Sequence, residues 1–74
     1  MNTKALADTR AAAILGLSRL KIAIALADEA LLAGDYAQAI GYLCDAQARA
    51  ITAKIDTAAL AAANIEDQER RYRK

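Results

Sequence analysis

Residues 26–46, LADEALLAGDYAQAIGYLCDA, decide the fold of this chain. Helix-forming residues surround a single Gly-Asp pair at positions 34 and 35. Gly34 is suited to end a helix, because glycine adopts the left-handed backbone conformation without strain. Asp35 is suited to cap the next helix, because its carboxylate accepts hydrogen bonds from backbone N–H groups of the first turn. The pair therefore predicts a sharp corner between two antiparallel helices.

Before this corner, the sequence predicts one helix over residues 3–33. Asn2 or Thr3 can cap its start. Gly16 is its weak point, because glycine costs about 1 kcal/mol in a helix interior, and a break there is the alternative to a continuous helix. The apolar stripe expected to face the second helix comprises Leu6, Ala13, Leu17, Leu20, Ile24, Ala27 and Leu31.

After the corner, a second helix is expected over residues 36–71, giving a long antiparallel hairpin. A break at Asp56 and Thr57, with Asp56 as a new cap, would instead give a three-helix bundle. Tyr36 is expected to pack against the end of the first helix. The apolar stripe of the second helix comprises Tyr36, Ile40, Leu43, Gln47, Ile51, Ala58, Ala61, Ile65 and Tyr72.

The composition predicts a small, single all-α domain over residues 1–74. The chain is rich in good helix formers and contains no proline. Chains of this length bury a small core, and many are stabilised by disulfides or metal ions. Here Cys44 is the only cysteine and there is no histidine, so neither is expected. Self-association or binding to a partner is the remaining source of stability.

No arrangement of residues predicts catalysis, a cofactor or a metal site. Histidine, the usual general base, is absent, and the carboxylates do not form an evident pair. Cys44 lies beside an apolar stripe, where a small core residue is expected rather than a nucleophile. The apolar run at residues 11–27 contains Arg19 and Lys21, so it predicts neither a membrane span nor a signal peptide. A soluble, cytoplasmic protein that is not an enzyme is expected.

Several large apolar residues fall outside the two predicted stripes. They predict a second contact surface, since large exposed apolar patches usually bind another protein. A homodimer forming a four-helix bundle is favoured, together with binding of an unidentified protein. Tyr42 is the leading contact candidate, because aromatic residues are enriched at binding hot spots. The predicted surface consists of Tyr42, Leu60, Ile14, Leu15, Ile22 and Leu32.

The C-terminal end is basic and supports an alternative function. A nucleic-acid-binding dimer would use these cations on phosphates and the tyrosine as a stacking platform. The competing interpretation is structural, because cations also stabilise the negative end of a helix dipole. The candidate nucleic-acid contacts are Arg70, Arg71, Tyr72, Arg73 and Lys74.

The corner segment also resembles part of a tetratricopeptide repeat. The resemblance covers residues 26–46 and implies a packed helical hairpin, with protein binding as the usual role of that family. The closing proline and a second repeat are missing, so it does not imply a peptide-binding groove. The leading hypothesis is a small adaptor, inhibitor or regulator, of a kind often encoded by phages or mobile elements. The matching residues are Leu26, Ala27, Ala30, Gly34, Asp35, Tyr36, Ala39, Ile40, Tyr42, Leu43 and Ala46.

Overall fold

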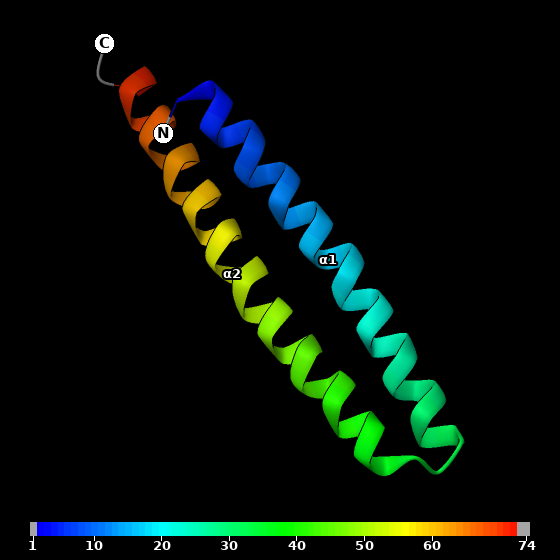
Figure 1. The fold of residues 1–74 in the computed structure, drawn as a ribbon. Coiled ribbons are helices and arrows are strands. Elements are labelled where there is room, and N and C mark those ends of the chain that lie inside the picture. Colours follow the sequence, from blue (N-terminus) through cyan, green and yellow to red (C-terminus); the bar gives the residue numbers. More distant parts are fainter. Residues whose placement is uncertain (1, 73–74) are drawn as a thin grey trace.

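The structure is a rod made of two antiparallel helices. This computed structural model describes residues 2–72, without the side chains at positions 67 and 72. Helix α1 (Thr3–Leu32) and helix α2 (Tyr36–Tyr72) lie side by side, with the start of α1 and the end of α2 at the same end of the rod (Figure 1). The Cα atoms span 61 × 17 × 13 Å. The expected all-α antiparallel hairpin is confirmed.

Both helices are continuous, as the favoured interpretation predicted. α1 passes through Gly16 without a break, and α2 passes through Asp56 and Thr57. At Thr57 the hydroxyl donates a 2.7 Å hydrogen bond to the Ala53 carbonyl, one turn earlier. The Thr57 hydroxyl is therefore hydrogen-bonded within the continuous helix, and the alternative three-helix bundle is not formed.

The corner forms as the Gly-Asp pair predicts. Gly34 has φ +78°, and its N–H donates to the Leu31 carbonyl at 3.1 Å. The Asp35 N–H donates to the Ala30 carbonyl at 2.9 Å, which completes the paired hydrogen bonds of a Schellman cap. Asp35 Oδ1 then accepts a 3.2 Å hydrogen bond from the Gln38 N–H and caps α2.

The start of α1 is also capped. Asn2 Oδ1 accepts a 2.7 Å hydrogen bond from the Ala5 N–H, and Asn2 itself has extended backbone angles. Both helix starts are therefore fixed by local side chains, independently of the contacts between the helices. This explains why the helix boundaries follow closely from the sequence.

The helices meet along a seam of residues with alternating spacings of three and four. All of its members are buried or half-buried, and every buried residue in the described part of the chain is an alanine. A repeat of this spacing is the heptad pattern of coiled coils. We call this set the alanine seam; it consists of Leu6, Thr9, Ala13, Gly16, Leu20, Ala23, Ala27 and Ala30 of α1 and Ala39, Tyr42, Ala46, Arg49, Ala53, Asp56, Leu60 and Ala63 of α2.

Leu6 and Leu20 of the predicted stripes lie in this seam, but most of the larger apolar stripe residues do not. Leu17, Ile24 and Leu31 are 47–53% exposed, and Tyr36 is 66% exposed rather than packed against the end of α1. The physical reason is the distance between the helix axes, which depends on the side chains at the contact. Alanine and glycine let the backbones approach along the whole rod, whereas bulky residues would hold them apart. Further apolar stripe residues of α2 that are exposed are Ile40, Leu43, Ile51 and Ile65.

Candidate protein-interaction surface

Several of the exposed apolar residues lie together on one side of the hairpin. On α1, residues of this side immediately follow residues of the alanine seam and repeat every seven positions, so they form one straight row. On α2, Leu43 occupies the equivalent position, and Ala50 and Thr57 continue the row. Equivalent positions of two antiparallel packed helices face the same side. We call this surface the apolar face; its large residues are Leu17, Ile24, Leu31, Tyr36, Ile40 and Leu43.

A groove in the middle of the apolar face confirms that both helices contribute to it. The groove has a volume of about 530 Å³ and is open to solvent. Leu17 of α1 and Thr57 of α2 both line it, although they are far apart in the sequence. Its floor is formed mainly by methyl groups, because alanine dominates this part of α2. The lining residues are Leu17, Leu20, Ala50, Ala53, Lys54, Thr57, Ala58 and Ala61.

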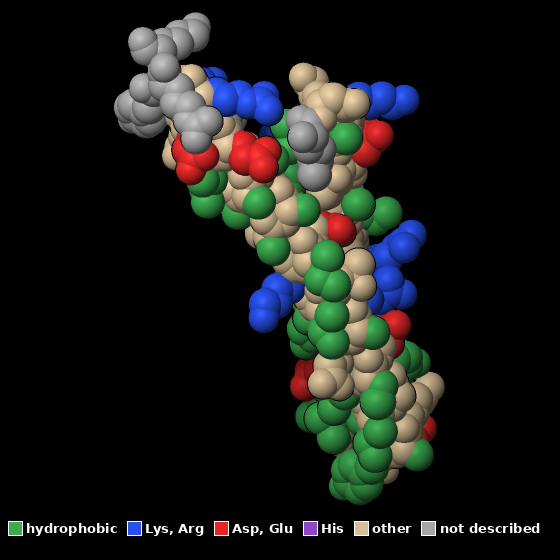
Figure 2. Space-filling model, turned by 90° about the vertical axis from the view of Figure 1, so that its left-hand side faces the viewer, with side chains coloured by type: hydrophobic (Ala, Val, Ile, Leu, Met, Phe, Trp, Pro, Cys, Tyr) green, Lys and Arg blue, Asp and Glu red, His purple; other side chains and the backbone are tan. Residues whose placement is uncertain are grey.

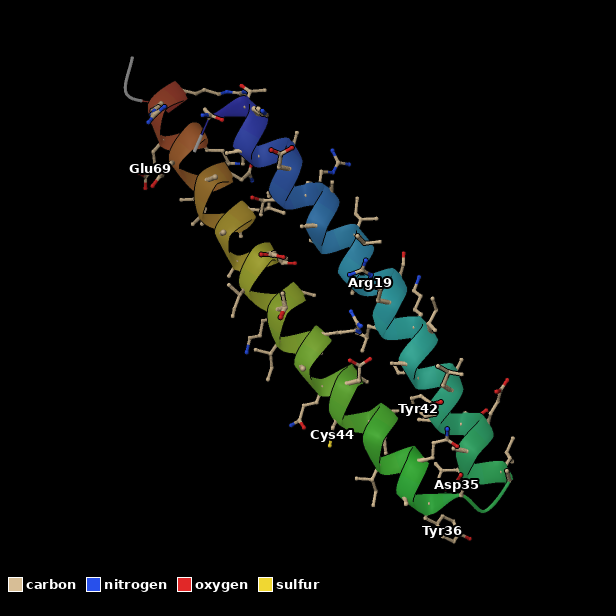
Figure 3. All side chains as sticks on the ribbon, viewed as in Figure 1. Arg19, Asp35, Tyr36, Tyr42, Cys44 and Glu69 are labelled. Carbon is tan, nitrogen blue, oxygen red and sulfur yellow. The ribbon has the colours of Figure 1, made fainter. Side chains whose placement is uncertain are left out.

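The apolar face therefore has two different halves. The half near the corner carries the bulky side chains, and the half toward the middle of the rod carries the groove. Figure 2 views the rod from its α2 edge and shows hydrophobic side chains along its length, with the corner end largely covered by them. Tyr36 extends away from the corner (Figure 3). Gln47 is an exposed polar residue of α2 between the two halves.

The opposite side of the hairpin carries both polar and apolar residues. Arg49 Nε lies 2.9 Å from Asp45 Oδ2, and Gln38 Nε2 donates a 3.1 Å hydrogen bond to Tyr42 Oη. Arg19 of α1 lines a hollow of about 270 Å³ together with Tyr42, Asp45 and Arg49 of α2. Ile22 and Leu26 line the same hollow, so this side differs from the apolar face in carrying an ion pair and hydrogen-bonding groups among its apolar residues.

The six residues predicted to form a partner surface do not lie together. Tyr42 and Leu60 are half-buried in the alanine seam, and Tyr42 points toward α1 (Figure 3). Ile22 lines the hollow on the side opposite the apolar face. The remaining residues, Ile14, Leu15 and Leu32, are exposed, but they point in different directions around α1, because successive helical positions are rotated by about 100°.

The apolar face itself was missed as an exposed surface. The sequence signal was present, because Leu17, Ile24 and Leu31 repeat every seven residues. That row was interpreted as the contact between the two helices. The alanine row one position earlier, which includes Ala23 and Ala30, takes that contact instead.

The predicted basic cluster is partly described. Arg70 and Arg71 are exposed in the last turn of α2, as the helix-dipole interpretation also expects. Arg73, Lys74 and the side chain of Tyr72 lie outside the described residues.

At the same end of the rod, Arg10 of α1 and Arg70 of α2 line a hollow of about 460 Å³ together with Glu66. Figure 2 shows both basic and acidic side chains at this end. Each helix therefore contributes an arginine to this hollow, beside the carboxylate of Glu66.

The described residues contain no group of three or more potential ligands that could hold a metal ion. Cys44 is exposed and points away from α1 (Figure 3), so its expected place in the core is wrong. Between residues 2 and 72, neither helix has a stretch apolar and long enough to cross a bilayer.

Comparison with known proteins gives no relative from which a function can be transferred. No protein-family model, curated protein or solved structure matches this chain significantly. The likeness to a tetratricopeptide repeat is therefore supported only as far as the packed helical hairpin.

Proposed function

We propose that this chain is a non-enzymatic protein–protein interaction module, a small adaptor, inhibitor or regulator that acts in the cytoplasm as a helical-hairpin dimer. The apolar face carries this proposal. Most large apolar side chains lie outside the seam, and every buried residue in the described part of the chain is an alanine, which is the reverse of a self-sufficient helical domain. Contiguous apolar surface of this kind marks a site of protein association.

The exposed side chains also favour association energetically. Leu17, Ile24 and Leu31 are each about half exposed in the hairpin. Fully burying such a side chain contributes about 1.5–3 kcal/mol, so covering the exposed half contributes about 1 kcal/mol each. The α2 residues of the face add contributions of similar size. Covering the face thus supplies stability that the alanine seam alone lacks.

Sedimentation velocity between about 1 and 100 μM, with circular dichroism of the same samples, tests this proposal; these concentrations correspond to binding free energies near −8 to −5.5 kcal/mol. A helical species of twice the chain mass supports it. A fully helical monomer at every concentration refutes the dimer. Loss of helix on dilution indicates that the hairpin needs its partner to fold.

Nucleic-acid binding is the second candidate, because both helices contribute cations to the end of the rod that carries Arg70 and Arg71. A gel shift with short duplex and single-stranded probes should weaken steeply with salt, in proportion to the phosphates contacted. Deletion of residues 70–74 should abolish the shift, whereas Arg19→Ala in the middle of the rod should not. A shift that survives the deletion, or none at low salt, rejects this candidate.

A further inference from the structure

We propose that the occupant of the apolar face is the same face of a second copy, docked in antiparallel orientation about a two-fold axis beside Gln47. This proposal rests on the proposed function and names the surface and geometry of its dimer. In this arrangement α1 lies against α1 of the partner copy and α2 lies against α2. The corners of the two hairpins point in opposite directions.

The two halves of the apolar face are complementary in shape. The bulky residues Tyr36, Ile40 and Leu43 lie about 2–12 Å from the corner, from the rise of 1.5 Å per residue. Residues 50–61, which line the groove, lie about 22–39 Å from it. A two-fold axis about 19 Å from the corner superposes the bulky half of each copy on the groove of the other. The same axis places Ile24 against Leu17 of the second copy.

The α2 residue at the level of the axis also favours this arrangement. Gln47 lies about 18 Å from the corner, which is the level of the axis. A residue at a two-fold axis meets its own counterpart, so it must be complementary to itself. The glutamine amide satisfies this requirement, because it carries both a donor and an acceptor. A polar pair inside an apolar helix interface also fixes the register of the helices.

Lys21 and Asp28 of α1 also lie on this side. Lys21 is about 18 Å from the corner, at the level of the axis, so it meets its own counterpart and both ammonium groups must extend outward into water. Lys21 and Lys54 are both exposed, and a lysine covers apolar surface with its stem while the ammonium remains in water. By contrast, Asp45 and Arg49 occupy the middle of the opposite side of the rod. Covering that side would bury charged groups, which is unfavourable without new partners.

The area of the proposed overlap is close to that of a specific protein interface. The proposed overlap is about 38 Å long, from the rise per residue, on a rod 17 Å wide. This gives a footprint of about 650 Å² for each copy, close to the roughly 800 Å² per partner of a standard specific interface. The ends that carry Lys4 and Arg70 remain outside the overlap. One second copy is therefore sufficient to cover both the bulky half and the groove.

Cross-linking in a Cys44→Ala background tests the axis. Gln47→Cys should form a disulfide-linked dimer under mild oxidation, because two copies of this position meet. Leu32→Cys at the corner should not, because the corners lie about 38 Å apart in the antiparallel arrangement. Efficient cross-linking of Leu32→Cys without cross-linking of Gln47→Cys would overturn the proposal in favour of a dimer with adjacent corners.

Charge substitutions test the face without depending on a new cysteine. Ile24→Glu should raise the dimer dissociation constant at least tenfold, whereas Ile22→Glu, on the opposite side of the same helix, should change it less than threefold. If Ile22→Glu disrupts the dimer and Ile24→Glu does not, the face is wrong although the chain dimerises. If the unmodified chain sediments only as a monomer, the dimeric function itself fails.

Discussion

Enlarging one alanine of the seam should destabilise the protein, although it adds apolar surface. Ala39 is 1% exposed and lies between the helices near the corner. Leucine at this position would add three carbon atoms, worth about 2.4 kcal/mol if they were buried without strain. The seam has no room for them while its neighbouring alanines remain in contact, and overpacking of this kind costs about 1–3 kcal/mol. Pushing the helices apart would also weaken the adjacent contacts.

We expect Ala39→Leu to lower the free energy of unfolding by about 2 kcal/mol. The matched control is Ala37→Leu on the same helix, which is exposed and should change stability by less than about 0.5 kcal/mol. Urea denaturation followed by circular dichroism measures both, at one protein concentration, because association shifts apparent stability. If Ala39→Leu is as stable as the parent chain or more stable, then alanine does not set the distance between the helices and this reasoning fails.

Three further predictions concern the backbone and the caps, and each is measured by thermal or urea denaturation. Gly34→Ala should cost about 1 kcal/mol, because φ is +78° there, whereas Gly16→Ala should gain up to about 1 kcal/mol, because an added Cβ meets nothing within 4 Å. Equal effects at the two glycines would contradict this. Asp35→Ala should cost about 1 kcal/mol and Asp35→Asn much less, because asparagine also caps helices. Cys44→Ser should change stability by less than about 0.5 kcal/mol, because the thiol is exposed; a larger loss would place it in an interface.

The corner and the helix boundaries could be predicted because their causes are local. Asn2, Gly34 and Asp35 act on backbone groups a few residues away, and the structure shows each of them doing so. No information about the opposite helix is needed to predict such caps. The sequence therefore predicts the length of each arm and the position of the turn.

The seam could not be predicted in the same way, because each helix offers more than one apolar row. The rows differ by one position in the sequence, as Ala23 and Ile24 do, and hydrophobicity favours the isoleucine. Close approach of the backbones favours the alanine. Which row forms the contact depends on the side chains of both helices, so it cannot be decided from either helix alone. The predicted partner surface depended on the same choice of row, because Tyr42 and Leu60 were placed outside the contact between the helices and lie half-buried within it.

The alanine seam has a consequence for the uniqueness of the fold. Alanine has no side-chain rotamers to lose on burial, and on α2 it recurs at positions 39, 46 and 53. Sliding one helix past the other by seven residues would place many methyl groups in nearly equivalent surroundings, so the seam specifies its own alignment weakly. The corner removes this ambiguity, because only three residues separate Leu32 from Tyr36. Two separate peptides covering α1 and α2 would sample several alignments, and a longer corner would let the arms of two chains exchange.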